Sequence, residues 1–538
     1  MSEQERLVRL EKDVAVLAAD SLLGREAGTK GEIMAMSYLA SRFQQMQLKP
    51  ILSDNTYFQE FEFISGATYK DGTSLIAGEK PLILEQEFYP LSYSASKAVQ
   101  TELIDVGFGL DTEAAATNDY ADKSSIQGKA FLMQLSVPGG IDNFVDYARQ
   151  AEIPAKIANA EKHGAAAVVF VNDDPNMADP SDKISLRVIP ADIPVVFVND
   201  QAAEKVKQAI GKTVDINVSI RKIRASAYNV VGLIDNNAAY TIVLGAHYDH
   251  LGMGGPSSRY VGPPEVHNGA DDNASGVAGI MEMARKATLK QNPRFNYLII
   301  AFSAEEHGLI GSSYFTKSKA YPMDKINAMI NFDMIGRMKD NTMRIVGTGT
   351  SPVWENLIKQ SNTENLRLRT SKSGSGGSDQ MSFYLDSIPV LFYFTGSHED
   401  YHKPSDDIEK LKFSSMLDII ESVERLVELL PYDKKLEFKK TESRRQSGRN
   451  PTKYTVTLGV MPDHTFEGKG MRIENVIQGR VSDEAGLKDG DVIIQMGEHE
   501  VTDIMSYMKA LSKFKKGQTT TIQVKRGNNI LEKQVQFK

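Results

Sequence analysis

Short apolar runs recur through the middle of the chain, and the strongest of them are followed by acidic residues or histidines. Their length and β-branched content are typical of buried strands. Longer segments with helical spacing lie between and after them, such as Gly276–Leu289 and Ser414–Leu430. This alternation predicts an α/β fold. The four strongest runs are Thr241–Ala246, Tyr297–Ser303, Ile326–Phe332 and Ile388–Thr395.

The same pattern divides the chain into parts. Two amphipathic helices surround the turn Ser21–Glu32, and a separate small α/β module without catalytic clusters follows. The segment 433–453 is charged and lacks apolar periodicity, which is typical of a linker. The C-terminal part alternates short strands with one helix, Ile504–Phe514. We therefore expect an N-terminal part of the main domain at 1–95, an insert at 96–225, a core at 226–432, the linker, and a final domain at 454–538.

Composition narrows the classes of function. The 538 residues include 62 basic and 70 acidic side chains, a net charge of −8, which argues against nucleic-acid partners and anionic membranes. No apolar run is long enough to span a membrane. Cysteine is absent, which excludes thiolate ligands, a cysteine nucleophile and disulfides. The polar N-terminus lacks the pattern of a signal peptide, so we expect either a cytoplasmic protein or one whose signal peptide was removed.

Histidines and carboxylates gather just after the apolar runs. Because chemistry in open α/β sheets lies at the carboxyl ends of strands, we expect these residues to form one site. Two histidines and several carboxylates in one place indicate two divalent metals and hydrolysis. Six of the nine histidines lie in the segment from His247 to His402, which strengthens the prediction of one shared metal site. The candidates are His247, Asp249, Asp271, Asp272, Glu305, Glu306, Asp333 and His402.

Each motif also has an ordinary structural explanation when taken alone. His247 and Asp249 fit a strand end with a surface aspartate, and His402 fits a surface turn. Spacing does not decide whether Asp271 or Asp272 bridges two cations. Ser275 is expected to cap the helix that follows. The adjacent carboxylates of Glu305 and Glu306 repel each other without a cation. For this pair a role in the metal site is therefore favoured over a solvated helix start.

With these motifs aligned, the chain resembles the co-catalytic zinc metallopeptidases known as metallopeptidase family twenty-eight. That family includes secreted bacterial aminopeptidases and the related glutaminyl cyclases. The resemblance implies a mixed, largely parallel sheet flanked by helices. It also implies two divalent ions, most simply Zn²⁺, with His247 and Asp333 on one ion and Glu306 and His402 on the other. Asp272, which precedes x-x-Ser-Gly, would be the bridge.

The resemblance assigns two further roles and two further domains. Glu305 would be the general base, and Asp249 the partner of His247. The insert resembles a protease-associated (PA) domain in IQGKAFLMQ and IPVVFVN. The C-terminal part resembles a PDZ domain in AGLKDGDVI, with Tyr454–Pro462 as the loop for a peptide carboxylate. Gln380 stands where many members have histidine, and the tyrosine that assists the oxyanion in some members has no evident counterpart.

These features predict an aminopeptidase that acts on peptide substrates, in which two metals and Glu305 activate water. The PDZ-like domain would bind a peptide C-terminus. The resemblance also implies a secreted or periplasmic location, with cytoplasmic location left open. Two alternatives remain at this stage: a glutaminyl-cyclase-like acyltransferase, and a non-catalytic scaffold that acts through its PDZ-like domain.

Overall fold

The computed structural model describes the chain apart from residue 1 and a number of short segments. The largest undescribed segment is 442–455. The others are 113–116, 122–125, 141–142, 185–187, 189, 256, 261, 290–292, 365, 463–465, 467, 477–479, 503, 512, 516, 528 and 538. Among the helices described, none is long and apolar enough to cross a membrane.

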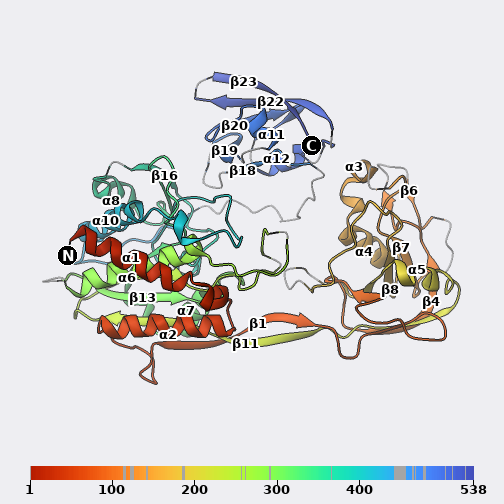
Figure 1. Cartoon of the computed structure of the whole chain (residues 1–538), viewed down its shortest axis with the longest axis horizontal. Helices are drawn as coiled ribbons and strands as arrows, with labels where there is room; N and C mark the ends of the chain where they lie inside the picture. Colours follow the sequence, from red (N-terminus) through yellow and green to blue (C-terminus); the bar gives the residue numbers. More distant parts are fainter. Residues whose placement is uncertain are drawn as a thin grey trace. The chain divides into compact units, whose positions relative to one another are not determined.

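The described residues divide into two compact units, of which the first comprises 1–63 and 225–538 and the second 64–224. An eight-stranded mixed sheet forms the centre of the first unit (Figure 1). Its four middle strands run parallel, as expected from the apolar runs. In spatial order the strands are β1 (Phe58–Thr68), β11 (Arg221–Ile234), β13 (Asn296–Phe302), β12 (Thr241–His247), β14 (Ile326–Phe332), β17 (Val390–Phe394), β15 (Thr342–Val346) and β16 (Arg367–Ser371).

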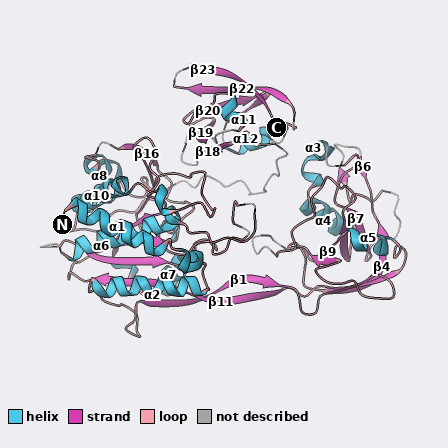
Figure 2. Cartoon of the chain, viewed as in Figure 1, coloured by secondary structure: helices cyan, strands magenta, loops and turns pink. Residues whose placement is uncertain are grey.

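Helices cover both faces of this sheet (Figure 2). Alternate residues of β12 point to opposite faces, so Ile242 and Leu244 join one apolar cluster and Val243 joins another. Both faces of the sheet are therefore buried, which explains why the parallel strands are continuous apolar runs in the sequence. The first cluster packs against α1 (Glu3–Leu17), α2 (Lys30–Gln45), α6 (Gly276–Thr288), α8 (Trp354–Ser361) and α10 (Phe413–Leu429), and the second against α7 (Ile310–Ser318) and α9 (Gln380–Leu385).

The second unit has its own seven-stranded sheet. It begins at Ile64, ahead of the expected start at residue 96, because β2 and β3 pair with β10 and β9 of the same sheet. Helices α4 (Ile153–Lys162) and α5 (Asp200–Lys207) pack on opposite faces. The strand order is β2 (Ser74–Ile76), β10 (Thr213–Asn217), β4 (Ala98–Asp105), β7 (Ala130–Gln134), β8 (Ala167–Val171), β9 (Val195–Val198) and β3 (Phe88–Pro90).

The C-terminal residues form a smaller, mostly antiparallel sheet with its own apolar cluster. The described part of the expected linker contacts the core: Leu436 is buried and its N–H donates to Asn327. The rest of that segment, and the start of the expected carboxylate loop at Tyr454, lie outside the described residues. The elements are β18 (Val460–Pro462), β19 (Met471–Val476), α11 (Val481–Glu484), β20 (Val492–Met496), β21 (His499–Glu500), α12 (Ile504–Leu511), β22 (Thr519–Arg526) and β23 (Asn529–Gln536).

A buried arginine ties the N-terminal segment to the loops that follow β12. The Arg25 guanidinium donates to the carbonyls of Tyr248 (2.8 Å), Asn268 (2.7 Å) and Gly269 (3.1 Å), and also to that of Leu17. Gly24 beside it has φ +66°, and a Cβ there would lie 2.4 Å from the carbonyl oxygen of Gly252. The Gly-Arg pair of the turn Ser21–Glu32 therefore fits directly against the carboxyl end of the sheet.

Replacing Arg25 by methionine should destabilise the first unit strongly. Four main-chain carbonyls would lose their donor, and each buried acceptor left unpaired costs about 1–3 kcal/mol. We expect the free energy of unfolding, measured by urea denaturation, to fall by at least about 3 kcal/mol. The exposed Arg367, changed in the same way, should alter it by less than about 0.5 kcal/mol. Equal urea midpoints for the two variants would contradict this role of Arg25.

Candidate metal centre

Four parallel strands deliver the candidate side chains to one edge of the sheet. His247 is the last residue of β12, and Asp333 follows β14 directly. Glu306 follows β13, and His402 lies in the loop after β17. Asp272 comes from the irregular turn Ala270–Ser275 that leads into α6. The structure thus brings all five expected metal-ligand residues to the carboxyl ends of the strands, where the sequence pattern placed them.

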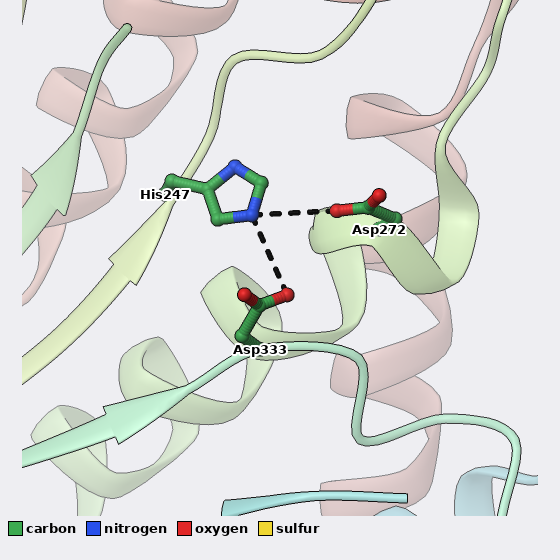
Figure 3. A group of neighbouring side chains, drawn as sticks. All are labelled: His247, Asp272 and Asp333. Carbon is green, nitrogen blue, oxygen red and sulfur yellow. Dashed lines mark ion pairs between the residues drawn. The ribbon is translucent and has the colours of Figure 1, made fainter. Parts of the chain in front are cut away.

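The first cluster consists of His247, Asp272 and Asp333 (Figure 3). The ring Nε2 of His247 lies 3.3 Å from Asp272 Oδ1 and 3.4 Å from Asp333 Oδ1. All three side chains are buried. Asp333 Oδ1 has no hydrogen-bond partner among the described residues, which is costly for a carboxylate oxygen unless a cation meets it.

The second cluster uses the other oxygen of the same aspartate. His402 Nε2 lies 3.3 Å from Asp272 Oδ2 and 3.3 Å from Glu306 Oε2. A further histidine, His250, places its Nδ1 2.9 Å from Glu306 Oε1. Asp272 therefore faces both clusters with separate oxygens, an arrangement suited to a bridging ligand. The peptide bond between Asp272 and Asn273 is cis.

Asp249 organises the main chain of the two glutamates. Its Oδ1 accepts the N–H of Glu305 at 3.1 Å, and its Oδ2 accepts the N–H of Glu306 at 3.3 Å. The expected contact with His247 is less direct: Nδ1 lies 3.1 Å from the main-chain oxygen of Asp249 and 3.7 Å from its carboxylate. One buried carboxylate thus sets the position of the Glu-Glu pair and also lies beside the His247 ring.

Asp271 faces away from both clusters. Its Oδ1 accepts from the N–H of Gly336 at 2.6 Å and from the Ser275 hydroxyl at 3.0 Å, and its Oδ2 lies 3.2 Å from His398. Ser275 stands at the N-cap position of α6, but its hydroxyl is bonded to Asp271 and makes no capping hydrogen bond. The expectation that its side chain caps α6 is therefore wrong. The Oδ1 of Asn273 accepts the N–H of Gly276 instead.

A second support for Asp272 was missed by sequence reasoning. The buried Asp406 accepts the main-chain N–H groups of Asp271 and Asp272 with one oxygen, each at 3.0 Å. It lies in the segment that follows His402, which reads as a polar turn with no sign of burial. Tyr401 was also missed; its ring stacks on His402 with 3.9 Å between centroids.

Comparison with known proteins identifies three domains in the chain. Residues 229–427 match the model of peptidase family M28, residues 99–206 that of the PA domain, and residues 439–537 that of the PDZ domain. The chain carries an M28 peptidase domain with a PA insert and a C-terminal PDZ domain. This confirms the family resemblance and, with the observed sheets, the expected fold class.

Among individual proteins, aminopeptidase YwaD of Bacillus subtilis is 28% identical over 274 residues, which cover 48% of this chain and 55% of the relative. A probable leucine aminopeptidase of Trichophyton verrucosum is 27% identical over 36% of this chain and 52% of its own length. The chain thus spans about half the length of these curated relatives. Among solved structures, an aminopeptidase from Aneurinibacillus sp. strain AM-1 has a TM-score of 0.49 at 23% identity, covering 81% of this chain and 95% of that one.

Within the M28 domain, the two adjacent glutamates have opposite electrostatics. Burial raises the pKa of Glu305 well above its usual range, and Glu306, Asp379 and Asp333 add to the effect. Burial also opposes ionisation of Glu306, but hydrogen bonds with His250 and His402 outweigh it and lower its pKa to about 2. Glu306 therefore has the charged carboxylate that a metal ligand requires, whereas Glu305 is a carboxylate with increased affinity for a proton.

A further buried carboxylate, Asp379, lies at the start of α9 beside the site. Burial raises its pKa to about 7, and the charges of Asp249 and Asp333 contribute. Hydrogen bonding with the Ser312 side chain opposes this rise in pKa. The neighbouring Ser312 hydroxyl is within reach of Ser382 Oγ at 2.9 Å. Gln380, where the family often has histidine, accepts from Asn331 at 3.3 Å.

The donor set fits two divalent cations. Each cluster combines imidazole nitrogen with carboxylate oxygen, the ligands that Zn²⁺ takes in sites without cysteine. Burial by itself lowers the pKa of His402, yet its contacts with Asp272 and Glu306 raise it to about 10. The carboxylates of Asp272 and Glu306 therefore stabilise positive charge at this position.

The two aspartates of the Asp-Asp pair should respond differently to substitution. Asp272→Asn should weaken metal binding at both clusters by at least about 10-fold each, because even supporting residues of metal sites have effects of 10–100-fold. Asp271→Asn can still accept from Gly336 and should keep the wild-type metal content while lowering the melting temperature. Elemental analysis after dialysis would measure both. Wild-type metal content in Asp272→Asn would contradict the bridging role.

Proposed function

We propose that this protein is a metal-dependent aminopeptidase that hydrolyses the N-terminal peptide bond of peptides. The observation that carries the proposal is Asp272, whose two oxygens face separate histidine–carboxylate clusters. The match to peptidase family M28 and the relatives named aminopeptidases support it. The cations proposed are two Zn²⁺ ions, one held by His247, Asp272 and Asp333 and the other by Asp272, Glu306 and His402. When bound, they would polarise the scissile carbonyl and make a water more acidic.

The chain's own groups supply the proton transfers. Part of the Glu305 surface is exposed, so water can reach it. The buried surroundings of its carboxyl group and the like charges nearby raise its pKa, so it is suited to take the proton of the attacking water. The same carboxyl group then returns the proton to the amine that leaves as the C–N bond breaks. Asp249 fixes the main chain of Glu305 and thereby its distance from the scissile bond.

The negative charge of the site favours a substrate with a free amino terminus. Two divalent cations do not neutralise all the carboxylates gathered here when these are ionised, and Asp379 is a further buried carboxyl group beside the site. An α-ammonium group has the matching charge and three donors. This is consistent with cleavage at the amino terminus rather than inside a peptide.

Hydrolysis of an aminoacyl-p-nitroanilide tests the proposal directly. We expect turnover that a strong chelator abolishes and that Zn²⁺ restores, and cleavage should be lost when the substrate amine is acetylated. A glutaminyl peptide serves as a second substrate. Cyclisation of that peptide without anilide hydrolysis would identify an acyltransferase, and activity unaffected by metal removal would contradict the proposal.

The roles of the two glutamates can be separated by isosteric substitution. Glu305→Gln removes the base, so kcat should fall by at least about 100-fold while the content of both metals stays at the wild-type level. Glu306→Gln should instead deplete the second metal. If Glu305→Gln loses metal and Glu306→Gln retains it, the two roles are exchanged. Metal content and kcat, measured on the same preparations, decide between these results.

A further inference from the structure

The motif after β12 contains a second histidine, His250, that the ligand set above does not use. Its side chain is fully buried. Nδ1 lies 2.9 Å from Glu306 Oε1 and 3.8 Å from Asp272 Oδ2. By distance alone His250 could be a metal ligand in place of His402, because His250, Asp272 and Glu306 also form a compact donor group.

The contacts of the ring favour a hydrogen bond with Glu306 over ligation. An ionised carboxylate only accepts hydrogen bonds, so Nδ1 must carry a hydrogen to make its contact with Glu306. Nε2 is then the bare nitrogen of the neutral ring. It is buried and has no hydrogen-bond partner among the described residues. Nε2 has no partner among the described residues in either tautomer, so the distances to both carboxylates decide between the two histidines. His402 Nε2 lies 3.3 Å from both Asp272 Oδ2 and Glu306 Oε2, whereas His250 Nδ1 lies within hydrogen-bond distance of Glu306 and 3.8 Å from Asp272 Oδ2.

The two oxygens of Glu306 therefore have different partners. Oε1 accepts from His250, and Oε2 lies 3.3 Å from His402 Nε2. We propose that His250 is a positioning residue, which holds Oε1 of Glu306 by its Nδ1–H and so directs Oε2 to the second cation together with Asp272 and His402. The proposal rests on the two-cation site of the proposed function.

The His250 ring is itself held firmly enough to direct a carboxylate. A Cβ on Gly269 would lie 2.5–2.6 Å from two ring atoms, so the Gly269 backbone packs directly on the imidazole. The His250 main-chain N–H donates to the carbonyl of Arg25 at 3.2 Å, and the Arg25 guanidinium donates to the carbonyl of Gly269. The arginine thus holds both the residue that carries the ring and the residue that packs on it.

The experiment compares His250→Ala with His250→Asn and His402→Ala. Asparagine is chosen because its side-chain NH₂ can occupy the position of Nδ1–H and donate to Glu306. His163→Ala is the matched control, since His163 pairs with a carboxylate, Asp111, at 2.9 Å in the second compact unit. Zn²⁺ stoichiometry and the affinity of each site are measured by competition with a chromogenic chelator, and the melting temperature is measured without metal.

In His250→Ala we expect the site of Asp272, Glu306 and His402 to lose about 10–100-fold in Zn²⁺ affinity, the range for partners that orient ligands. The affinity of the site of His247, Asp272 and Asp333 should stay within about twofold of wild type. His250→Asn should recover most of the loss at the other site. His402→Ala should lose the second ion altogether. If His250→Ala does not fold, His250→Gln, whose longer side chain misplaces the donor, is compared with His250→Asn.

Two results would overturn the proposal. Wild-type affinity in His250→Ala would show that Glu306 needs no such support. Loss of the second ion in both His250→Ala and His250→Asn, with His402→Ala retaining it, would make His250 the ligand. Wild-type protein that binds fewer than two ions is a separate result, because it would reject the two-cation site before any variant is compared.

Discussion

Like charges buried side by side are the constraint on which this structure depends. At the carboxyl edge of the sheet, Asp272 lies within 4.8 Å of Asp333 in one buried cluster and within 4.8 Å of Glu306 in the other. Such a group is stable only with positive charge among its members. Histidines from β12 and from the loop after β17 would provide the remaining ligands of the proposed cations. Asp272 gives one oxygen to each side, so that a single residue couples the two clusters.

The rest of the M28 domain holds these charges in place with main-chain and buried polar contacts. Asp406 holds the N–H of Asp272, Asp249 holds those of both glutamates, and Arg25 holds the carbonyls of the adjoining loops. Glu32 does the same beneath the site, accepting from the N–H of Tyr228 at 3.0 Å and from the Ser303 hydroxyl at 2.5 Å. These contacts explain why the first sixty residues belong with a core that begins at residue 225.

The sequence predicted the strands well, and it also predicted that the candidate side chains lie together, because both depend on local pattern. Apolar runs fixed β12 and β14, and the parallel sheet then placed His247 and Asp333 together. What it missed depends on contacts between distant segments. His250 has the same local setting as a surface histidine, and nothing in the sequence indicates that Gly269 packs on its ring. Strands β2 and β3 were missed because each has only three residues, too few for a period to be detected.

The different environments of Glu305 and Glu306 show why sequence spacing alone does not assign a chemical role to each residue. The two side chains are identical and adjacent, and Asp249 holds the main chain of both. They differ in their neighbours: two histidines contact Glu306 and stabilise its charged form, while burial and nearby carboxylates raise the pKa of Glu305. A ligand must stay ionised, whereas a base must gain and release a proton. The histidines therefore do more than occupy the metal site, because their contacts with Glu306 leave Glu305 as the glutamate suited to accept a proton.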